Sequence, residues 1–129
     1  MSASKKIINT SHAPAPIGPY NQAVKAGDTL YVSGQIALSP ETGELIQGTV
    51  ADEARQVLKN INAVLTEAGY SFADVVKTTI FLQDMNDFAV VNQVYGEYFT
   101  ESAPARETVA VAGLPKNVKV EISVVAWKK

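Results

Sequence analysis

The clearest pattern in the chain is helical and covers residues 50–68. Apolar side chains recur there at steps of three and four residues, so they fall on one face of a helix. Thr49 is placed to cap the N-terminus, with Asp52 three residues further on, and Gly69 follows the last turn. The pattern predicts one long amphipathic helix with a single buried face.

A second, shorter helical pattern follows a capping residue at Asp84 or Asn86. Its large apolar residues again recur at helical spacing: Phe88, Val91, Tyr95, Tyr98 and Phe99. This segment predicts a second amphipathic helix.

The remaining apolar segments have the character of strands. Segments 20–25 and 29–33 flank a short glycine-containing turn, which predicts a hairpin whose second arm continues through 36–38. Segment 75–82 is β-branched and aromatic with apolar residues on both faces, which predicts a central strand covered on both sides. Segments 107–112 and 118–127 are separated by a proline-containing turn and are expected to form a second hairpin.

The resulting order, β-β-α-β-α-β-β, predicts an α+β fold in which two helices pack on one face of a mixed β-sheet. No repeat or interior linker divides residues 1–129, so we expect a single domain. The other face of the sheet also carries apolar residues from segment 75–82. A partner subunit is therefore expected to cover it, most simply in a cyclic homo-oligomer.

Composition removes several classes of function. Eleven Lys and Arg against thirteen Asp and Glu give a net charge of -2, which offers no basic field for a nucleic acid. The absence of cysteine excludes disulfides, a thiolate nucleophile and sulfur-ligated zinc. The single histidine, His12, cannot assemble a multi-histidine metal site, so we expect no metal.

The N-terminal segment reaches only two apolar residues, Ile7 and Ile8, before Asn9. This is too few for a signal peptide, and no later apolar run approaches the length of a membrane span. A cytoplasmic protein with no membrane association is expected.

Two charged residues stand out as candidates for chemistry. Arg106 follows Pro104 and Ala105, where a fixed backbone would aim a planar guanidinium at a carboxylate; the alternative is a solvated charge at a strand end. Glu121 lies in the middle of a predicted strand, so it either faces solvent beside Lys119 or serves a reaction. On adjacent strands of a hairpin, these residues would share one cleft, with Arg106 holding a carboxylate and Glu121 orienting water.

Six short blocks occur in the chain in the following order: Ile-Gly-Pro-Tyr at 17–20, Val-Ser-Gly-Gln at 32–35, Val-Lys-Thr-Thr at 76–79, Asp-Phe through Asn at 87–92, Pro-Ala-Arg at 104–106, and Leu-Pro-Lys through Val-Glu-Ile at 114–122. Together they resemble the reactive intermediate deaminase family of the RidA type, over residues 6 to 126. The resemblance implies a chorismate-mutase-like fold and a homotrimer whose sheets face an inner barrel. It also places three sites in the clefts between subunits.

The activity implied by the resemblance is that of a 2-iminobutanoate/2-iminopropanoate deaminase. Such enzymes hydrolyse the 2-imino acids that arise from 2-aminoacrylate and 2-aminocrotonate, giving 2-oxo acids and ammonia without a cofactor. Arg106 is similar to the arginine that binds the substrate carboxylate, and Glu121 to the glutamate that holds the attacking water. The matching cleft positions are Tyr20, Ser33, Gly34, Asn92 and Thr108, the last of which is a cysteine in many relatives.

Another class of function stays open at this point. A regulatory protein could bind 2-oxo acids or another small ligand in the same inter-subunit cleft without turnover, since Arg106 would serve either role. Ribonuclease activity is attributed to some relatives, but the acidic balance and the two arginines of this chain weigh against it.

Overall fold

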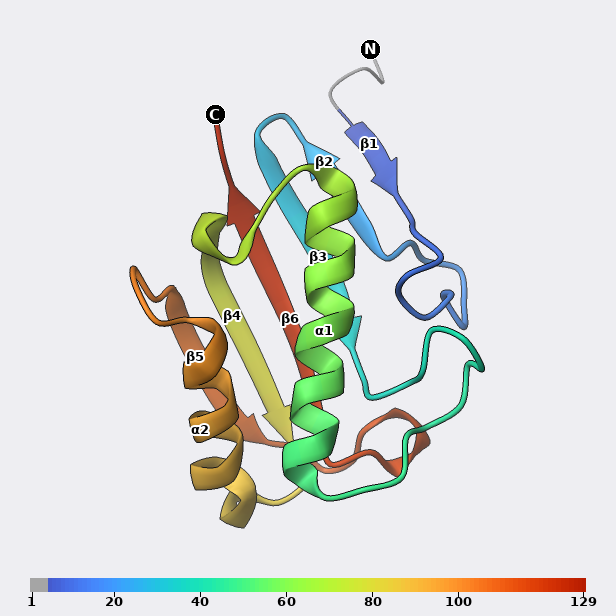
Figure 1. Ribbon diagram of the computed structural model, residues 1–129, viewed down its shortest axis with the longest axis vertical. Helices are drawn as coiled ribbons and strands as arrows, with labels where there is room; N and C mark the ends of the chain where they lie inside the picture. The colour runs from blue at the N-terminus through green and yellow to red at the C-terminus, as the bar shows by residue number, and fades with distance from the viewer. Residues whose placement is uncertain (1–4) are drawn as a thin grey trace.

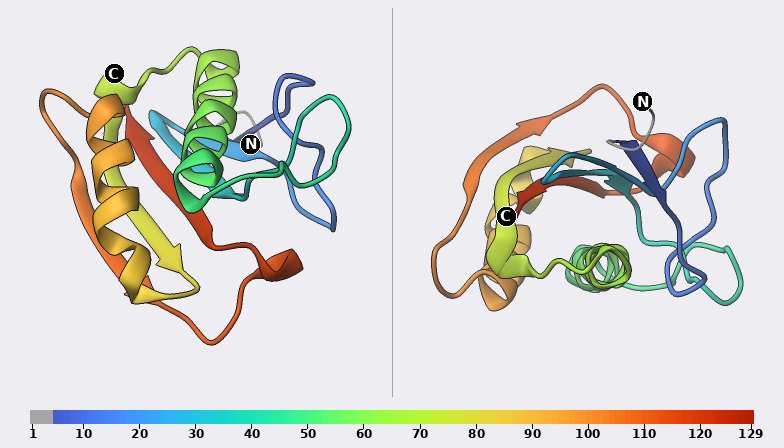
Figure 2. Two further views of the ribbon diagram at one scale, coloured as in Figure 1. Left: turned by 60° about the horizontal axis from the view of Figure 1, so that its bottom comes forward. Right: turned by 90° about the horizontal axis from the view of Figure 1, so that it is seen from above.

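The structure, a computed structural model, describes residues 5–129; the first four residues of the N-terminal segment considered above lie outside the described part. Six strands form one sheet, and two helices lie together on one of its faces (Figures 1 and 2). The strands are β1 (Lys5–Ile8), β2 (Ala23–Ala26), β3 (Thr29–Gln35), β4 (Val75–Leu82), β5 (Ala105–Ala110) and β6 (Val120–Trp127). The helices are α1 (Val50–Ala68) and α2 (Phe88–Tyr98), with single 3-10 turns at Phe72–Asp74, Met85–Asp87 and Pro115–Asn117. The α+β class with two helices on one face is confirmed.

The order of strands across the sheet is β1-β2-β3-β6-β4-β5. All neighbours are antiparallel except β4 and β5, which are parallel and are connected through α2. The expected hairpin between the last two strands is therefore wrong, because β4 lies between β5 and β6. A helical crossover returns β5 parallel to β4, and the chain after β5 must then pass the end of β4 before it reaches β6.

The N-terminal half also departs from expectation at two places. Residues 5–8 form an additional edge strand, β1, paired antiparallel with β2. Only Ile8 of this strand is buried, so four residues were too few to show an alternating pattern. The third strand ends at Gln35 rather than continuing through residues 36–38, which form part of a loop.

Helix α1 begins and ends as expected. Thr49 and Asp52 form a reciprocal capping box, in which the Asp52 amide donates to Thr49 Oγ1 and the Thr49 amide donates to the Asp52 carboxylate. Gly69 ends the helix in the left-handed region, at φ 82°. The buried face of α1 consists of Ala54, Val57, Leu58, Asn60, Ile61, Val64 and Leu65. This face packs on β3 and β6, where Leu30 and Ile122 are fully buried.

Helix α2 follows the 3-10 turn at Met85–Asp87, which is capped by the Asp84 side chain. Asp84 is thus one of the two expected capping residues, but it caps the turn before the helix rather than the helix itself. Tyr95 is buried and donates its hydroxyl to Thr78 Oγ1 of β4, 3.0 Å away. This bond fixes α2 over the parallel pair β4 and β5.

The sheet face directed away from the helices, here called the outer face, is only partly covered within one chain. In β6 the residues Val120, Ile122, Val124 and Ala126 are buried, while the alternate residues are half-buried or, at Trp127, exposed. In β4 the residues Lys77, Thr79 and Phe81 on this face are likewise half-buried, so coverage of β4 on both sides is not found in the single chain. Apolar side chains on other strands are also exposed: Tyr31 at 53% and Val109 at 43%.

Within residues 5–129, neither helix combines the length and the apolar character needed to span a bilayer.

Candidate functional site

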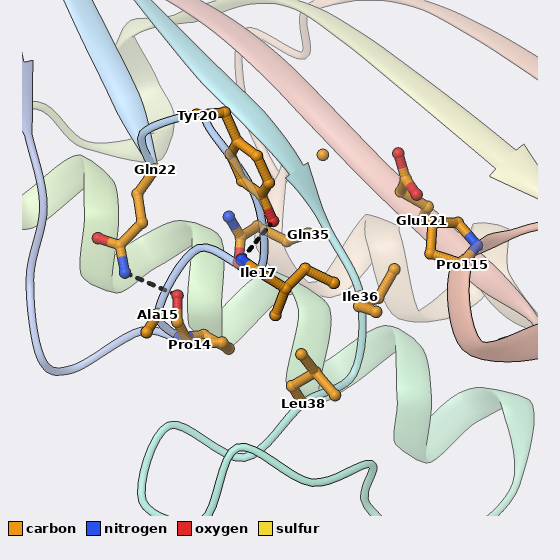
Figure 3. A pocket seen from close by; sticks show the side chains of 11 residues that line it. Pro14, Ala15, Ile17, Tyr20, Gln22, Gln35, Ile36, Leu38, Pro115 and Glu121 are labelled. Atoms are coloured by element: carbon orange, nitrogen blue, oxygen red, sulfur yellow. Dashed lines mark hydrogen bonds between the residues drawn. The ribbon is translucent and has the colours of Figure 1, made fainter.

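A pocket opens where the segment 14–20, the end of β3 and the start of β6 meet (Figure 3). It has two adjoining hollows that share Ile17, Tyr20, Gly34, Pro115 and Glu121. The outer hollow is a bowl of about 370 Å³ that Ser33 also lines, whereas the inner hollow is more enclosed and measures about 60 Å³. Tyr20, Ser33, Gly34 and Glu121, four of the seven residues assigned from the sequence, are therefore brought together.

Glu121 lies over Gly34 of the neighbouring strand. A Cβ atom at position 34 would lie 2.8 Å from Glu121 Cδ and would overlap the carboxylate. Glycine at position 34 thus leaves this space to the Glu121 carboxylate, and any side chain there would displace the flexible end of Glu121. Glu121 is half-buried, and this burial raises the pKa of its carboxyl above the ordinary value of 4.5.

The wall that carries Tyr20 is held by the buried side chain of Gln22. Its Oε1 accepts from the Thr10 amide at 2.7 Å, and its Nε2 donates to the carbonyls of Thr10, Ala13 and Pro14 at 2.8–3.2 Å. The Ile17 amide in turn donates to the Tyr20 hydroxyl at 3.2 Å, so the segment also positions the aromatic ring. Sequence reasoning missed Gln22, because a single glutamine before a strand carries no signal that separates a buried amide from a solvated one.

Ser33 contributes to the same wall. Its hydroxyl donates to the Asn21 carbonyl at 2.6 Å, and its amide donates to the Gln22 carbonyl at 2.9 Å. These bonds connect the end of β3 to the segment that carries Tyr20, so the Ser33 hydroxyl serves the pocket wall within this chain.

Arg106 lies in a second group of residues, on the helix-facing side of the edge strand β5. Its Nη1 donates to Asn92 Oδ1 at 2.7 Å, and its guanidinium lies 4.9 Å from the ring centre of Tyr95 and 5.7 Å from that of Phe88. The pairing of Arg106 with Asn92 brings together two more of the assigned residues. A guanidinium held by one hydrogen bond and two aromatic rings keeps further N–H groups for a planar anion.

Arg106 and Glu121 do not share a cleft within one chain, contrary to the sequence-based expectation. On β4, Arg106 is in register with Thr78 and Glu121 with Phe81, an odd separation that places the two side chains on opposite faces of the sheet. Their backbones lie about 14 Å apart, because two strand spacings separate them across the sheet and three residues separate them along the strand direction. The candidate residues thus form two half-sites: the Glu121 half-site with Tyr20, Ser33 and Gly34, and the Arg106 half-site with Asn92.

Thr108 lies two residues after Arg106 on the same side of β5. Its Oγ1 is shielded from solvent and has no hydrogen-bond partner among the described residues. A shielded oxygen does not present its hydroxyl to a ligand, so the side chain of Thr108 acts here mainly by filling space.

The chain is similar to several known proteins over nearly its whole length. The family model described as Endoribonuclease L-PSP matches residues 10–128. A RutC family protein of Pyrococcus horikoshii is 55% identical over 97% of this chain and 99% of its own length, and the 2-iminobutanoate/2-iminopropanoate deaminase of Mus musculus is 50% identical over 97% and 93%. The crystal structure of E. coli TdcF with bound serine superposes with a TM-score of 0.92 at 45% identity, covering 96% of this chain and 99% of that one.

Replacing Gly34 with Ala tests the close approach of Glu121. The new methyl group overlaps the carboxylate, and the flexible Glu121 side chain should move out of the pocket while the backbone stays in place. We expect a melting temperature within a few degrees of wild type, as for other mild changes near the surface, and a displaced Glu121 in a crystal structure. An unmoved carboxylate would contradict the packing described here.

Replacing Thr108 with Val tests whether its hydroxyl is unpaired. Valine has the same shape, so removing an unsatisfied buried hydroxyl should stabilise the protein by about 1 kcal/mol, measured by chemical denaturation. A loss of stability of similar size would show that the hydroxyl has a partner in the assembled protein. Thr108→Ser, which retains the hydroxyl, is the control.

Proposed function

The chain belongs to the Endoribonuclease L-PSP family, which includes the RidA-type deaminases, and from this premise we propose that it hydrolyses 2-imino acids to 2-oxo acids and ammonia. Relatives named as 2-iminobutanoate/2-iminopropanoate deaminases support this activity, while others carry only a general family name. The observation that carries the proposal is Glu121, a half-buried carboxylate that lines a pocket and has a raised pKa.

Glu121 acts as the general base in this proposal. Water attacks the carbon of the protonated C=N bond and transfers a proton to the Glu121 carboxylate, giving a neutral tetrahedral carbinolamine. Glu121 then returns this proton to the nitrogen, and the C–N bond breaks to release ammonia. As the C=O bond of the 2-oxo acid forms, the hydroxyl proton passes to the Glu121 carboxylate and from there to solvent. A raised pKa suits this cycle, because the carboxyl group must both accept and return a proton. The imine carbon is already electrophilic, so the reaction needs no cofactor.

Arg106 holds the carboxylate of the substrate. Asn92 and the rings of Tyr95 and Phe88 fix its guanidinium, and the remaining N–H groups can form a bidentate contact with an α-carboxylate. This contact fixes the distance between the imine carbon and the water on Glu121, which lowers the entropic cost of the attack. Tyr20 and Gly34 shape the space around the reacting carbon, and Ser33 and Thr108 support the two walls.

The reaction requires Arg106 and Glu121 in one site, and we propose that two copies of the chain supply them. One copy would contribute the Arg106 half-site and its neighbour the Glu121 half-site, in a cyclic homotrimer with three equivalent sites. The incompletely covered outer face supports such an assembly, because a neighbour would bury its exposed apolar side chains.

Cleavage of RNA, which the family description names, is not supported by the residues of these half-sites. The chain has a net charge of -2 and two arginines, of which Arg55 forms an exposed ion pair with Glu97. A groove that neutralises several phosphates would need more cations on one face.

The central experiment couples a threonine dehydratase to this protein and measures imine decay and release of 2-oxobutanoate. Wild type should accelerate the decay. Arg106→Ala should lower kcat/KM by about 100-fold or more, and Arg106→Lys should restore little, because an ammonium cannot reproduce the planar fork. Arg55→Ala is the matched control and should be unchanged. Binding of 2-oxobutanoate without turnover would instead support the regulatory role.

The pH dependence tests the role of Glu121. Lowering the pH through its raised pKa protonates the carboxylate and removes the base, so the catalysed rate should fall at a higher pH than an ordinary glutamate would give. Glu121→Gln should lower kcat by about 10²–10⁴-fold and abolish this acidic limb. Glu67→Gln, on the exposed side of α1, should leave the profile unchanged. An acidic limb that persists in Glu121→Gln would exclude Glu121 as its source.

A site shared between copies predicts complementation of two inactive variants. When Arg106→Ala and Glu121→Gln chains are mixed in equal amounts and their subunits exchanged, about a quarter of the sites in a cyclic trimer receive both intact residues. Roughly this fraction of wild-type activity should return. Each variant treated alone is the control and should stay inactive. No recovery in mixed trimers, with exchange verified by mass spectrometry, would contradict a shared site.

A further inference from the structure

The inner hollow behind Glu121 has no part in the proton transfers proposed above. It extends from the residues shared with the outer hollow toward Pro14, Ile36 and Leu38 (Figure 3). Its volume is about 60 Å³. A cavity of about 150 Å³ in another protein accommodates benzene, so a hollow of this size has room for about two carbon atoms.

Beyond the residues shared with the outer hollow, the inner hollow is lined by four apolar residues and two amides of the described chain. The apolar residues are Pro14, Ala15, Ile36 and Leu38, and the amides are Gln22 and Gln35. The Gln35 Nε2 donates to the Ser33 carbonyl at 3.4 Å. The Gln22 Oε1 and Nε2 already bind the backbone of Thr10, Ala13 and Pro14. A polar group that enters the deep end of the hollow gives up its hydrogen bonds to water and meets the Gln35 amide there as its one available side-chain partner among the described residues. An aliphatic group gives up no hydrogen bonds to water.

Both walls of the hollow are held by buried amide side chains. Gln22 fixes the segment 10–14 on one side, and Asn60 donates to the carbonyls of Ile36 and Leu38 on the other, at 3.2 and 3.1 Å. Gln22 and Asn60 are each 1% exposed. The hollow therefore has a defined size before any ligand enters.

We infer that the inner hollow binds the aliphatic side chain of the 2-imino acid, and that Ile36 and Leu38 limit this side chain to about two carbons. The inference rests on the proposed function. Glu121 lines both hollows, so a substrate with its reacting carbon at Glu121 has its substituents within reach of both. The carboxylate is directed to the partner's arginine, which leaves the apolar substituent for the inner hollow.

The test compares two substrates that differ only in side-chain length. An L-amino-acid oxidase generates 2-iminobutanoate from 2-aminobutyrate and 2-iminohexanoate from norleucine, and the ratio of the two kcat/KM values is measured. Wild type should favour the shorter substrate. Leu38→Ala should shift the ratio toward the longer one by about 10-fold or more, the usual effect of one or two methylene groups in an apolar pocket. Ile36→Val is a milder variant and should shift it in the same direction.

The ratio separates specificity from damage to the fold, because a reduced fraction of active protein cancels from it. Leu30→Ala removes an equally buried leucine outside the pocket and should leave the ratio unchanged. An unchanged ratio in both Leu38→Ala and Ile36→Val overturns the inference while deaminase activity itself persists. An equal shift in Leu30→Ala also overturns it.

Failure of the proposed function gives a different result, namely that wild type accelerates the hydrolysis of neither substrate. The relative affinities of 2-oxobutanoate and 2-oxohexanoate, measured by calorimetry, then test the hollow without turnover. If Leu38→Ala does not increase the relative affinity for 2-oxohexanoate, the inference is overturned.

Discussion

The parallel pairing of β4 with β5 decides how the candidate residues are distributed in this chain. Helix α2 connects these strands and covers them, so the first residues of β5 lie against Asn92 and Tyr95. The same crossover makes β5 an edge strand and leaves β6 on the other side of β4. Because their register positions on β4 differ by three residues, Arg106 and Glu121 lie on opposite faces, and no change of rotamer can bring them together across the sheet. The chemistry proposed for the chain consequently depends on a second copy.

Local features of the sequence predicted several elements closely. Helix α1 was defined by its apolar period and by the capping signals at Thr49 and Gly69, all of which act within a few residues. Strand β4 has the predicted bounds, because a dense run of β-branched residues needs no long-range information. The motifs also selected residues that lie together in space, such as Tyr20 with Glu121 and Asn92 with Arg106.

The missed features depend on contacts that a local pattern does not contain. A turn at Leu114 and Pro115 looks the same whether it joins neighbouring strands or passes the end of a third one, so the hairpin expected for β5 and β6 was wrong. Strand β1 is stabilised by pairing with β2 rather than by its own alternation. The role of Gln22 emerges only when residues 10–14 fold back onto its side chain.

The buried amides of Gln22 and Asn60 also affect how tightly the pocket could bind a ligand as small as a 2-imino acid. A 2-imino acid of seven heavy atoms has at most about 10 kcal/mol of binding free energy available, since even the best small ligands reach about 1.5 kcal/mol per atom. Ordering a flexible residue costs about 1–2 kcal/mol, so fixing a ten-residue wall on binding would consume the whole amount. Because folding has already fixed both walls, the free energy of each contact remains for holding and aligning the ligand. Two buried amides thus fix the pocket in advance, which favours the binding of a ligand as small as the 2-imino acid proposed above.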